Sequence, residues 1–509
     1  MMQGTRDIGV RTHARGRPIG AGLLVAAAML VACALVLVGW VGFLASDDAL
    51  YSGAAEGWLA RGMAYLPLDH WSVRHPVVLP IVASYAFLGR NEFSIALPTL
   101  LYWLALVGIT AWQLHRRLPM TVVLATLAVL VSAPLMVVWA SIASADIAET
   151  FFVALSLWVF LGAPAKSPRR MLLAGVLCAF AFLSRDTAVA LVLFYAGCFA
   201  LGLFGPRRDL FWVGVGAAAI VALEMAWYAV AAGDPLHRMS IALNHDSTVD
   251  RSVELAGNLL VSRAVDPLLM LLANQEFALI CVLGLPAVAW CLVAAFRGRR
   301  WRSRDPATVF AAYALAWMVF FYAASSLLPL NPRYAMSAVY AMIVALAFAA
   351  NDVRRAAGGM VMWAAAALLV LANAAALLVE NRATTYGEKV LAEQVAQRAE
   401  KIHTDRQTAY RAQVRLEWID RVEAVSVEAP PAGALYLRNP WRSSAWPATA
   451  RLQAGAAAPT GWEVVAVYDP PARPLAAPLQ ALGMDRHVPA PIASRLFKPN
   501  APVVLYRVR

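Results

Sequence analysis

The chain has 509 residues, of which 61% are hydrophobic and only 15% are charged, and its mean hydropathy is +0.62. No water-soluble domain of this length normally shows that balance, so the composition excludes a soluble enzyme and predicts a protein that crosses a membrane several times. The formal net charge of +12 does not indicate a nucleic-acid partner, because the lysines and arginines fall in short clusters between apolar runs.

Apolar runs long enough to cross a hydrocarbon core of about 30 Å recur between residues 20 and 379. The first run follows a basic tail, residues 1–19. Because it is about 25 residues long and has no small-residue cleavage site, we expect a retained signal anchor. We predict a polytopic α-helical fold of about eleven to thirteen spans. Eleven can be placed, at residues 20–44, 94–114, 119–139, 146–163, 171–184, 187–204, 209–231, 275–296, 307–327, 334–350 and 358–379.

Basic clusters give these spans a direction, because clusters between spans tend to stay on the cytoplasmic side. With every cluster inside, the N-terminus is inside as well. The apolar segment Pro76–Gly89 is short, and a crossing there would move the later clusters outside, so we expect an interfacial helix on the outer side. The clusters are Arg116-Arg117, Lys166 with Arg169-Arg170, Arg207-Arg208, Arg297 to Arg304 and Arg354-Arg355.

On this topology the first outer loop, residues 45–93, and the tail, residues 380–509, lie outside the transmembrane domain of residues 20–379. The composition changes abruptly at the tail, which predicts a separate small extracytoplasmic α/β domain. Its expected elements are a helix in Thr385–Lys401 and strands at Ala434–Leu437, Trp462–Tyr468 and Val503–Val508. All five cysteines lie in predicted spans, which indicates neither a disulfide framework nor a cysteine metal site.

Ionisable residues from distant loops converge on the outer face. Asp47 and Asp48 directly follow the first span, and charge at that border tends to mark a site because it is costly in hydrocarbon. Acids beside arginines fit a reaction in which a carboxylate deprotonates a hydroxyl while cations stabilise a phosphate leaving group. Polyprenyl-phosphate sugars supply such a leaving group without a nucleotide. The other members are Arg74, His75, Asp146, Glu149, Arg185, Asp186, His237, Arg238, His245, Asp246 and Arg333.

Five short motifs follow one another in a characteristic order: Asp47-Asp48 with Tyr51, His75-Pro76 before an apolar helix, Ser144-Ala145-Asp146-Ile147-Ala148-Glu149, Leu183-Ser184-Arg185-Asp186, and Asn331-Pro332-Arg333-Tyr334. In this order the chain resembles the GT-C superfamily, particularly bacterial aminoarabinose transferases that modify lipid A and the related protein O-mannosyltransferases. The resemblance covers roughly residues 20–350, and an outer C-terminal domain is expected with it.

The resemblance implies a role for each motif. Asp47 stands where these enzymes have an acid beside the reacting sugar and is the candidate general base. Asp146 stands where these enzymes have a second acid, which would position the acceptor or bind a divalent cation. The candidates for the donor phosphate are His75, Arg185, Arg333 and Tyr334, and the secondary candidates are Asp48, Tyr51, Arg74 and Glu149.

One position departs from the family pattern. The chain has Arg74-His75-Pro76 where the aminoarabinose transferases tend to have Glu-Lys-Pro, so a cation replaces an acidic metal ligand. The only cofactor that the resemblance implies is a divalent cation, for which Asp47 and Asp146 would be the ligands, and this departure leaves metal dependence open. His75 would be charged only in part, because an imidazole titrates near about pH 6.5.

Structural alternatives accompany two of the acids. Asp48 would be a solvated partner or a helix cap. Asp146 would cap a helix that begins at Ile147, with Glu149 completing a capping box.

The remaining charged and aromatic candidates have structural alternatives as well. Arg185 and Asp186 would form an ion pair within one turn, and Arg333 would reach toward lipid headgroups. A solvated loop is the default expectation for His237, Arg238, His245 and Asp246, and a belt or packing role is the default for Trp58, Trp71, Trp441 and Trp446.

The sequence therefore predicts a bacterial inner-membrane glycosyltransferase whose site faces the periplasm. It would move one sugar from a polyprenyl-phosphate carrier to a lipid or protein acceptor, with inversion in a single displacement. Lipid A or another envelope glycolipid is the first candidate acceptor, and Ser/Thr of a secreted protein is the second. The alternative of a different class is a transporter or flippase for lipid-linked sugars, which would more often show duplicated halves and broken midplane helices.

Overall fold

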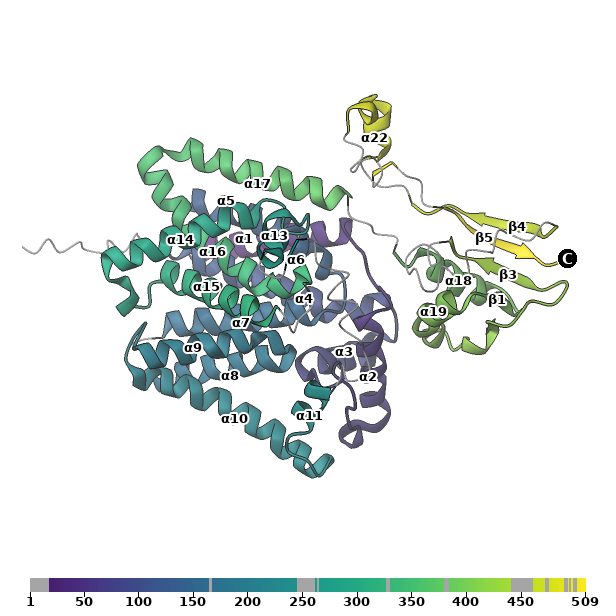
Figure 1. Cartoon of the computed structure of the whole chain (residues 1–509), viewed down its shortest axis with the longest axis horizontal. Helices are drawn as coiled ribbons and strands as arrows, with labels where there is room; N and C mark the ends of the chain where they lie inside the picture. The colour runs from purple at the N-terminus through teal and green to yellow at the C-terminus, as the bar shows by residue number, and fades with distance from the viewer. Residues whose placement is uncertain are drawn as a thin grey trace, which may run out of the picture.

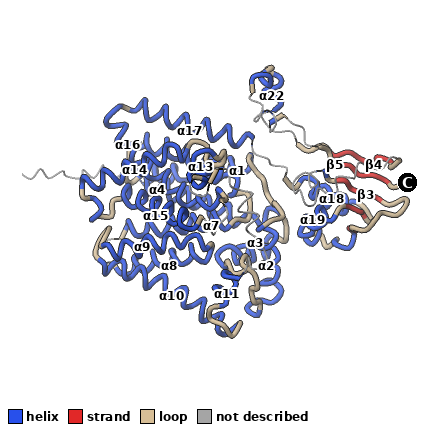
Figure 2. Tube along the Cα trace, in the orientation of Figure 1, coloured by secondary structure: helices blue, strands red, loops and turns tan. Residues whose placement is uncertain are grey.

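The computed structural model describes residues 18–163, 167–244, 261–262, 265–325, 330–379, 384–440, 461–471, 476–488, 493, 496–497 and 501–509. Residues 1–17 of the predicted basic tail lie outside these ranges, as do Lys166, His245, Asp246, Trp441 and Trp446. A helical bundle forms one part of the molecule, and a smaller α/β part follows it at the C-terminal end (Figure 1). The strands of the described chain all lie in that second part (Figure 2).

The bundle confirms a polytopic helical fold, with 8 described helices long and apolar enough to cross a membrane and further shorter apolar ones. Each of the eleven predicted spans contains a helix. The helices are α1 (Pro18–Val38), α4 (Glu92–His115), α5 (Met120–Ser132), α6 (Pro134–Trp139), α7 (Ala145–Gly162), α8 (Pro168–Ser184), α9 (Val189–Leu201), α10 (Arg207–Ala231), α14 (Ile280–Gly298), α15 (Pro306–Ala324), α16 (Met336–Ala357) and α17 (Gly359–Val379).

Two helices end earlier than the apolar runs do. The run 20–44 is helical only to Val38, because Gly42 (φ 74°) and Ala45 (φ 55°) adopt left-handed backbone conformations that no α-helix contains. The run 119–139 breaks between α5 and α6 at Pro134, which has no backbone N–H to continue the helix. Residues 39–46 instead form an irregular segment that leads into the first outer loop.

Short elements cover the outer end of the bundle. The helix α3 (His75–Leu88) would be about 21 Å long at 1.5 Å per residue, too short for a core of about 30 Å, as expected for an interfacial helix. Tyr102 Oη of α4 donates to the Pro76 carbonyl at 2.8 Å and attaches α3 to the bundle. These elements are α2 (Asp47–Arg61), η1 (Gly62–Ala64), α3 (His75–Leu88), η2 (Asp186–Ala188), α11 (His237–Asn244), α13 (Asp266–Ala273) and η4 (Pro332–Ala335), and η3 (Arg300–Arg302) lies at the opposite end.

The C-terminal part is a mixed sheet of five strands in the order β2-β1-β3-β5-β4. β1 pairs in parallel with β2 and β3, whereas β5 pairs antiparallel with β3 and β4. The predicted helix and three strands are present, and β1 and β2 were too short to give a sequence signal. The elements are α18 (Tyr386–Gln397), β1 (Ile402–Thr404), α19 (Arg406–Trp418), η5 (Val422–Ala424), β2 (Val425–Ser426), β3 (Leu435–Arg438), β4 (Glu463–Tyr468), α22 (Ala476–Ala481), η6 (Met484–His487) and β5 (Val503–Arg507).

Two glycines let α8 and α10 pack backbone against backbone. A Cβ at Gly175 would lie 1.9 Å from the Val213 carbonyl oxygen, and a Cβ at Gly216 would lie 2.1 Å from that of Leu172. Small residues at such crossings allow the close approach by which helices associate in lipid. This contact lies in the inner half of α8, ten residues before Arg185, and joins that helix to α10.

We expect Gly216→Ala to lower the thermal unfolding temperature of the purified protein in detergent, because its methyl group must push α8 and α10 apart at a cost of about 1–3 kcal/mol. The matched control is Gly214→Ala on the same helix, where a Cβ meets no atom within 4 Å. That change should leave the unfolding temperature equal or slightly higher, since alanine favours helix over glycine. Equal unfolding temperatures for the two variants would contradict the close packing.

Candidate active site

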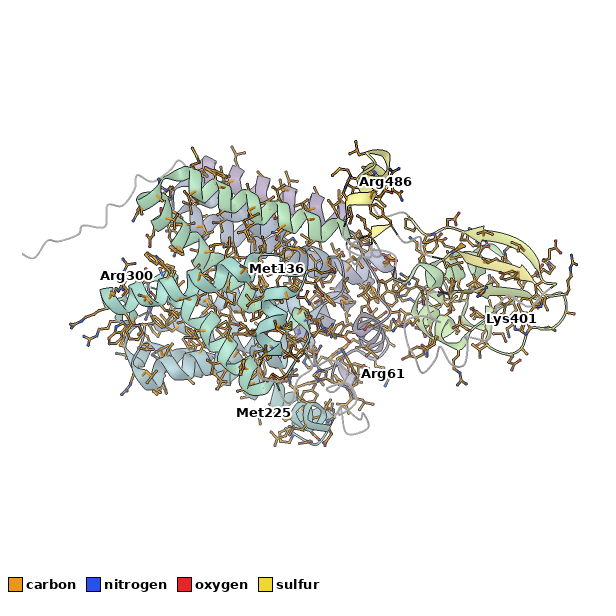
Figure 3. All side chains as sticks on the ribbon, turned by 45° about the horizontal axis from the view of Figure 1, so that its top comes forward. Arg61, Met136, Met225, Arg300, Lys401 and Arg486 are labelled. Atoms are coloured by element: carbon orange, nitrogen blue, oxygen red, sulfur yellow. The ribbon has the colours of Figure 1, made fainter. Side chains whose placement is uncertain are left out.

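The outer end of the bundle brings together charged residues from four separate parts of the chain. Asp47 opens α2, Asp146 lies in the first turn of α7, Arg185 follows α8, and Arg333 lies in η4 just before α16. These are predicted site residues, and the contacts below connect them. Figure 3 shows Arg61 of α2 near the C-terminal part and Arg300 of a predicted inside cluster at the far end of the bundle.

Asp47 and Arg333 form an ion pair, with 2.8 Å between Asp47 Oδ2 and Arg333 Nη1. Burial alone would raise the pKa of Asp47, but the nearby guanidinium groups of Arg333, Arg74 and Arg185 outweigh it and lower that pKa below its ordinary value of 3.8. The Arg333 guanidinium also lies over the Trp139 ring, 5.2 Å from the ring centroid. Arg333 therefore points into the protein and does not reach toward lipid headgroups.

Asp146 pairs with Arg185, and both side chains are buried. The helix cap here is Ser144, whose hydroxyl oxygen accepts from the Asp146 N–H at 3.1 Å. The alternative of Asp146 as the cap of a helix starting at Ile147 is therefore wrong, and its carboxylate is available for Arg185. The Tyr334 ring covers the same guanidinium, at 4.3 Å from its carbon to the ring centroid.

Glu149 lies one turn further along α7 and is also buried. Its Oε2 accepts from the Thr187 hydroxyl at 2.7 Å, whereas its Oε1 is buried without a hydrogen-bond partner in the described part of the chain. The capping-box role proposed for it is wrong, because its carboxylate contacts η2 and not the helix end.

Arg74 is buried and bonded to the Tyr51 hydroxyl and to His70 Nε2. It lies immediately before α3, so the first outer loop contributes this cation as well as Asp47. Burial raises the pKa of Tyr51, although Arg74 acts in the opposite direction, so the phenol keeps its proton and can donate a hydrogen bond.

His75 turns away from these groups. Its Nδ1 lies 3.1 Å from Glu224 Oε1, and its ring packs against Trp58 and Trp227. Trp58 and Trp227 themselves stack at 5.7 Å between centroids, which agrees with the expected packing role of Trp58. The role of His75 at a donor phosphate stays a prediction.

Two expectations for the neighbouring loops are wrong. Arg238 is not solvated but buried, since it donates to the Val73 carbonyl at 2.7 Å and pairs with Asp186 at 3.3 Å and Glu224 at 3.5 Å. Asp186 consequently pairs with Arg238 and not with Arg185, because the two side chains leave the turn in different directions. His237 is bonded to the Pro67 carbonyl at 2.8 Å, which ties α11 to the first outer loop.

Sequence reasoning missed Glu224, His70 and Trp139. Glu224 had a usable signal, since it is an acid within the long apolar run of α10 and charge inside such a run needs a partner. His70 and Trp139 had none, because a loop histidine and an interfacial tryptophan are ordinary in membrane proteins.

Asp48 supports the backbone that leads to Asp47. It is buried, and its carboxylate accepts from the N–H groups of Leu44, Ser46 and Ala49. The expected cap-like role agrees with this geometry, but the expected solvation does not. Burial raises the pKa of Asp48 to about 6, although the backbone donors act in the opposite direction.

The C-terminal part bonds to Phe43, which lies in the same segment as Asp48 and precedes it. Arg415 of α19 donates to the Phe43 carbonyl at 3.2 Å and to Thr385 Oγ1 at 3.1 Å, and it pairs with Glu92 at 3.2 Å. Glu92 Oε1 in turn accepts from the Phe43 N–H at 3.3 Å. Both backbone groups of Phe43 are thus bonded to charged side chains, four residues before Asp47.

The carboxylates do not fit the divalent cation that the resemblance implied. Asp47 Oδ2 and Asp146 Oδ1 each pair with a guanidinium group, so each carboxylate already has a cation as its partner. Within the part of the chain that the structure describes, no three His, Cys, Asp or Glu side chains are grouped to hold a metal ion.

Comparisons with known proteins bear on the fold and on part of the sequence. Residues 74–228 match a family model described as dolichyl-phosphate-mannose-protein mannosyltransferase. The crystal structure of ArnT from Cupriavidus metallidurans in the apo state is 14% identical, with a TM-score of 0.55 over 96% of this chain and 98% of that chain. The structure of the same protein bound to undecaprenyl phosphate is 13% identical, with a TM-score of 0.53 over 97% of this chain and 99% of that chain. No curated protein sequence matches the chain.

The fold and the site define a class: multi-pass membrane proteins in which the loops at one face assemble a cluster of acids and arginines. Within that class, the chain has the fold of ArnT, and residues 74–228 match the model of the mannosyltransferase family.

We expect Arg415→Ala to loosen residues 43–49, because it removes one of the two donors to the Phe43 carbonyl and leaves Glu92 without its cation, at a cost of about 1–3 kcal/mol. Hydrogen–deuterium exchange of these amides should then be about 5- to 150-fold faster. Arg406→Ala, an exposed arginine of the same helix, is the control and should leave their exchange unchanged. Equal exchange in the two variants would show that the C-terminal part does not support this segment.

Proposed function

We propose that the protein is a membrane glycosyltransferase that moves a sugar from a polyprenyl-phosphate donor to an extracytoplasmic acceptor. The observation that carries the proposal is the cluster around Asp47, in which one carboxylate pairs with Arg333 while Arg74 and Arg185 lie close enough to lower its pKa. A carboxylate beside several arginines matches the two needs of glycosyl transfer, a base for the acceptor and positive charge for the leaving phosphate.

Three arginines and two phenols are the proposed donor-phosphate subsite. Guanidinium groups bind phosphate with two parallel hydrogen bonds, and Arg74, Arg185 and Arg333 all lie around Asp47. Tyr51 and Tyr334 contact two of these arginines and would orient them. The matching family of mannosyltransferases uses a dolichyl-phosphate sugar by its description, and ArnT has been crystallised with undecaprenyl phosphate. His75 remains a more distant candidate for the same phosphate.

The donor phosphate itself would activate the base. In the free protein the arginines hold the pKa of Asp47 low, so its carboxylate is a weak base. A phosphate that bonds to Arg333 would take over part of that positive charge and add negative charge of its own. Both changes raise the pKa of Asp47, so the carboxylate becomes a better base when the sugar is in place.

The reaction then follows as one in-line displacement. The acceptor oxygen attacks the anomeric carbon while Asp47 takes its proton, and the bond from that carbon to the phosphate oxygen breaks. The electron pair of that bond leaves with the phosphate, where the arginines stabilise the charge. A single displacement inverts the configuration at the anomeric carbon. Asp146 and Glu149 would keep Arg185 in position from the other side.

The acceptor is proposed from the class of enzyme. An envelope glycolipid such as lipid A is the first candidate, since the predicted topology puts the site at the periplasmic face of the bacterial inner membrane. Transfer to Ser/Thr of a protein is the second candidate, supported by the description of the matching family model. A carrier that only relocates a lipid-linked sugar is the alternative of a different class.

We expect Asp47→Asn to lower kcat by about 10²- to 10⁴-fold, the usual contribution of general acid–base catalysis, with little change in the affinity for the donor. The assay uses protein reconstituted with a radiolabelled polyprenyl-phosphate sugar and extracted envelope lipids. Asp420→Asn, at an exposed aspartate of the C-terminal part, is the control and should keep full activity. Relocation of the donor with its glycosidic bond intact would identify a transporter, and full transfer by a well-folded Asp47→Asn protein would exclude Asp47 as the base.

Arg333→Gln should move the acid limb of the pH profile of kcat/KM to higher pH. The base must be deprotonated to act, and this change removes a cation that lowers the pKa of Asp47 in the free enzyme. The loss of one charged hydrogen bond to phosphate should also lower kcat/KM by about 10- to 150-fold. Arg333→Lys keeps the charge and should leave the acid limb near its original position. If the acid limb does not shift in Arg333→Gln, then Asp47 is not the group whose titration sets that limb.

A further inference from the structure

A second site candidate lies within the bundle, between α5, α14, α16 and α17. The structure has an apolar groove there with a cavity of about 390 Å³. Its walls include Ile343 and Ala350 of α16, Trp290 of α14, and Val361 and Ala366 of α17. None of the residues of the candidate active site contributes to it.

The groove lies toward the opposite membrane face from Asp47. Arg333 marks the outer end, just before α16 begins at Met336, whereas the lining residues of α16 run from Ile343 to Val353. At 1.5 Å per residue the groove extends for about 15 Å along α16. That length is about half of a hydrocarbon core of about 30 Å, so the groove has the depth of a single leaflet.

Two of the helices that form the groove each carry an arginine beyond its inner end. Arg354 follows Ala350 by four residues on α16, and Arg297 follows Trp290 by seven residues on α14, so each shares a helix face with a lining residue. The helices α14 and α16 run side by side. A Cβ at Gly284 would lie 2.9 Å from Met342 Cβ, and Trp290 Nε1 lies 3.4 Å from Asp352. Arg297 and Arg354 therefore lie at a similar depth, at the inner end of the groove.

The side chain of Arg354 has unused hydrogen-bonding capacity. Its Nη2 donates to Asn351 at 3.4 Å, while its Nε is buried and has no partner among the described residues. Arg297 is exposed, and Trp290, two turns before it on α14, is also exposed and donates its indole N–H to Asp352 at 3.4 Å. An apolar wall that ends in two guanidinium groups and an amphipathic ring matches a lipid, whose chains are apolar and whose phosphate is anionic.

We propose that this groove binds an anionic phospholipid of the leaflet opposite Asp47, with an acyl chain along α16 and α17 and its phosphate between Arg297 and Arg354. Arginines near a cytoplasmic surface are attracted to anionic lipids in general. The groove adds a defined place for one chain directly beneath them. The occupant is a structural lipid of the bundle, and the proposal is independent of the sugar transfer at the outer face.

The test compares two phenylalanine variants of neighbouring residues on α17. Ala366→Phe fills the groove, whereas Ala367→Phe adds the same side chain at the next position, which is exposed on the outside of the bundle. Full-length proteins are reconstituted with equal amounts of phosphatidylglycerol and phosphatidylethanolamine, extracted, and analysed for bound lipid by native mass spectrometry. We expect wild type and Ala367→Phe to retain one phosphatidylglycerol, and Ala366→Phe to retain it at least 10-fold less.

A second pair of variants tests the headgroup contacts. Arg297→Gln with Arg354→Gln should abolish the preference for phosphatidylglycerol over phosphatidylethanolamine, and Ala365→Leu supplies a milder filling variant if Ala366→Phe does not fold. The proposal is overturned if both phenylalanine variants retain the same lipid as wild type, or if wild type retains the two phospholipids equally. Displacement of the bound phosphatidylglycerol by an equimolar polyprenyl phosphate would overturn it too, because the groove would then belong to the donor.

Discussion

The outer face depends on the ion pair between Asp47 and Arg333, because it joins the first outer loop to the start of α16 across most of the chain. Both side chains are largely shielded from solvent, and an unpaired charge is costly in such surroundings. The same constraint operates at Asp146, whose buried carboxylate pairs with the buried Arg185.

This charge compensation also keeps the arginines of the site ordered when no donor is bound. The arginines that would meet a phosphate are already positioned by carboxylates and aromatic rings, so little ordering remains when a donor arrives. In the proposed mechanism, an incoming phosphate would replace the Asp47 carboxylate as the partner of Arg333, and that carboxylate would then lie next to the reacting carbon. Donor binding would in this way activate the base.

The bundle and most of the C-terminal strands could be predicted from the sequence, because long apolar runs and β-rich segments have strong local signals. The membership of the outer cluster was also predictable in part: Asp47, Asp146, Arg185 and Arg333 all border apolar runs. Their pairing was not predictable, since which arginine meets which acid depends on how helices pack. Arg238 and His75 illustrate this, because Glu224, an acid on a distant helix, attracts both.

The bond from Arg415 to Phe43 has a consequence for domain exchange. Engineers often treat an extracytoplasmic module as a detachable unit that can be swapped between related enzymes to alter selectivity. Here such chimeras would lose contacts between the two parts, because α19 and Thr385 donate the hydrogen bonds that a membrane-proximal turn accepts. A functional graft must therefore transfer Phe43 and Glu92 together with the sheet, so that both sides of these contacts come from one parent.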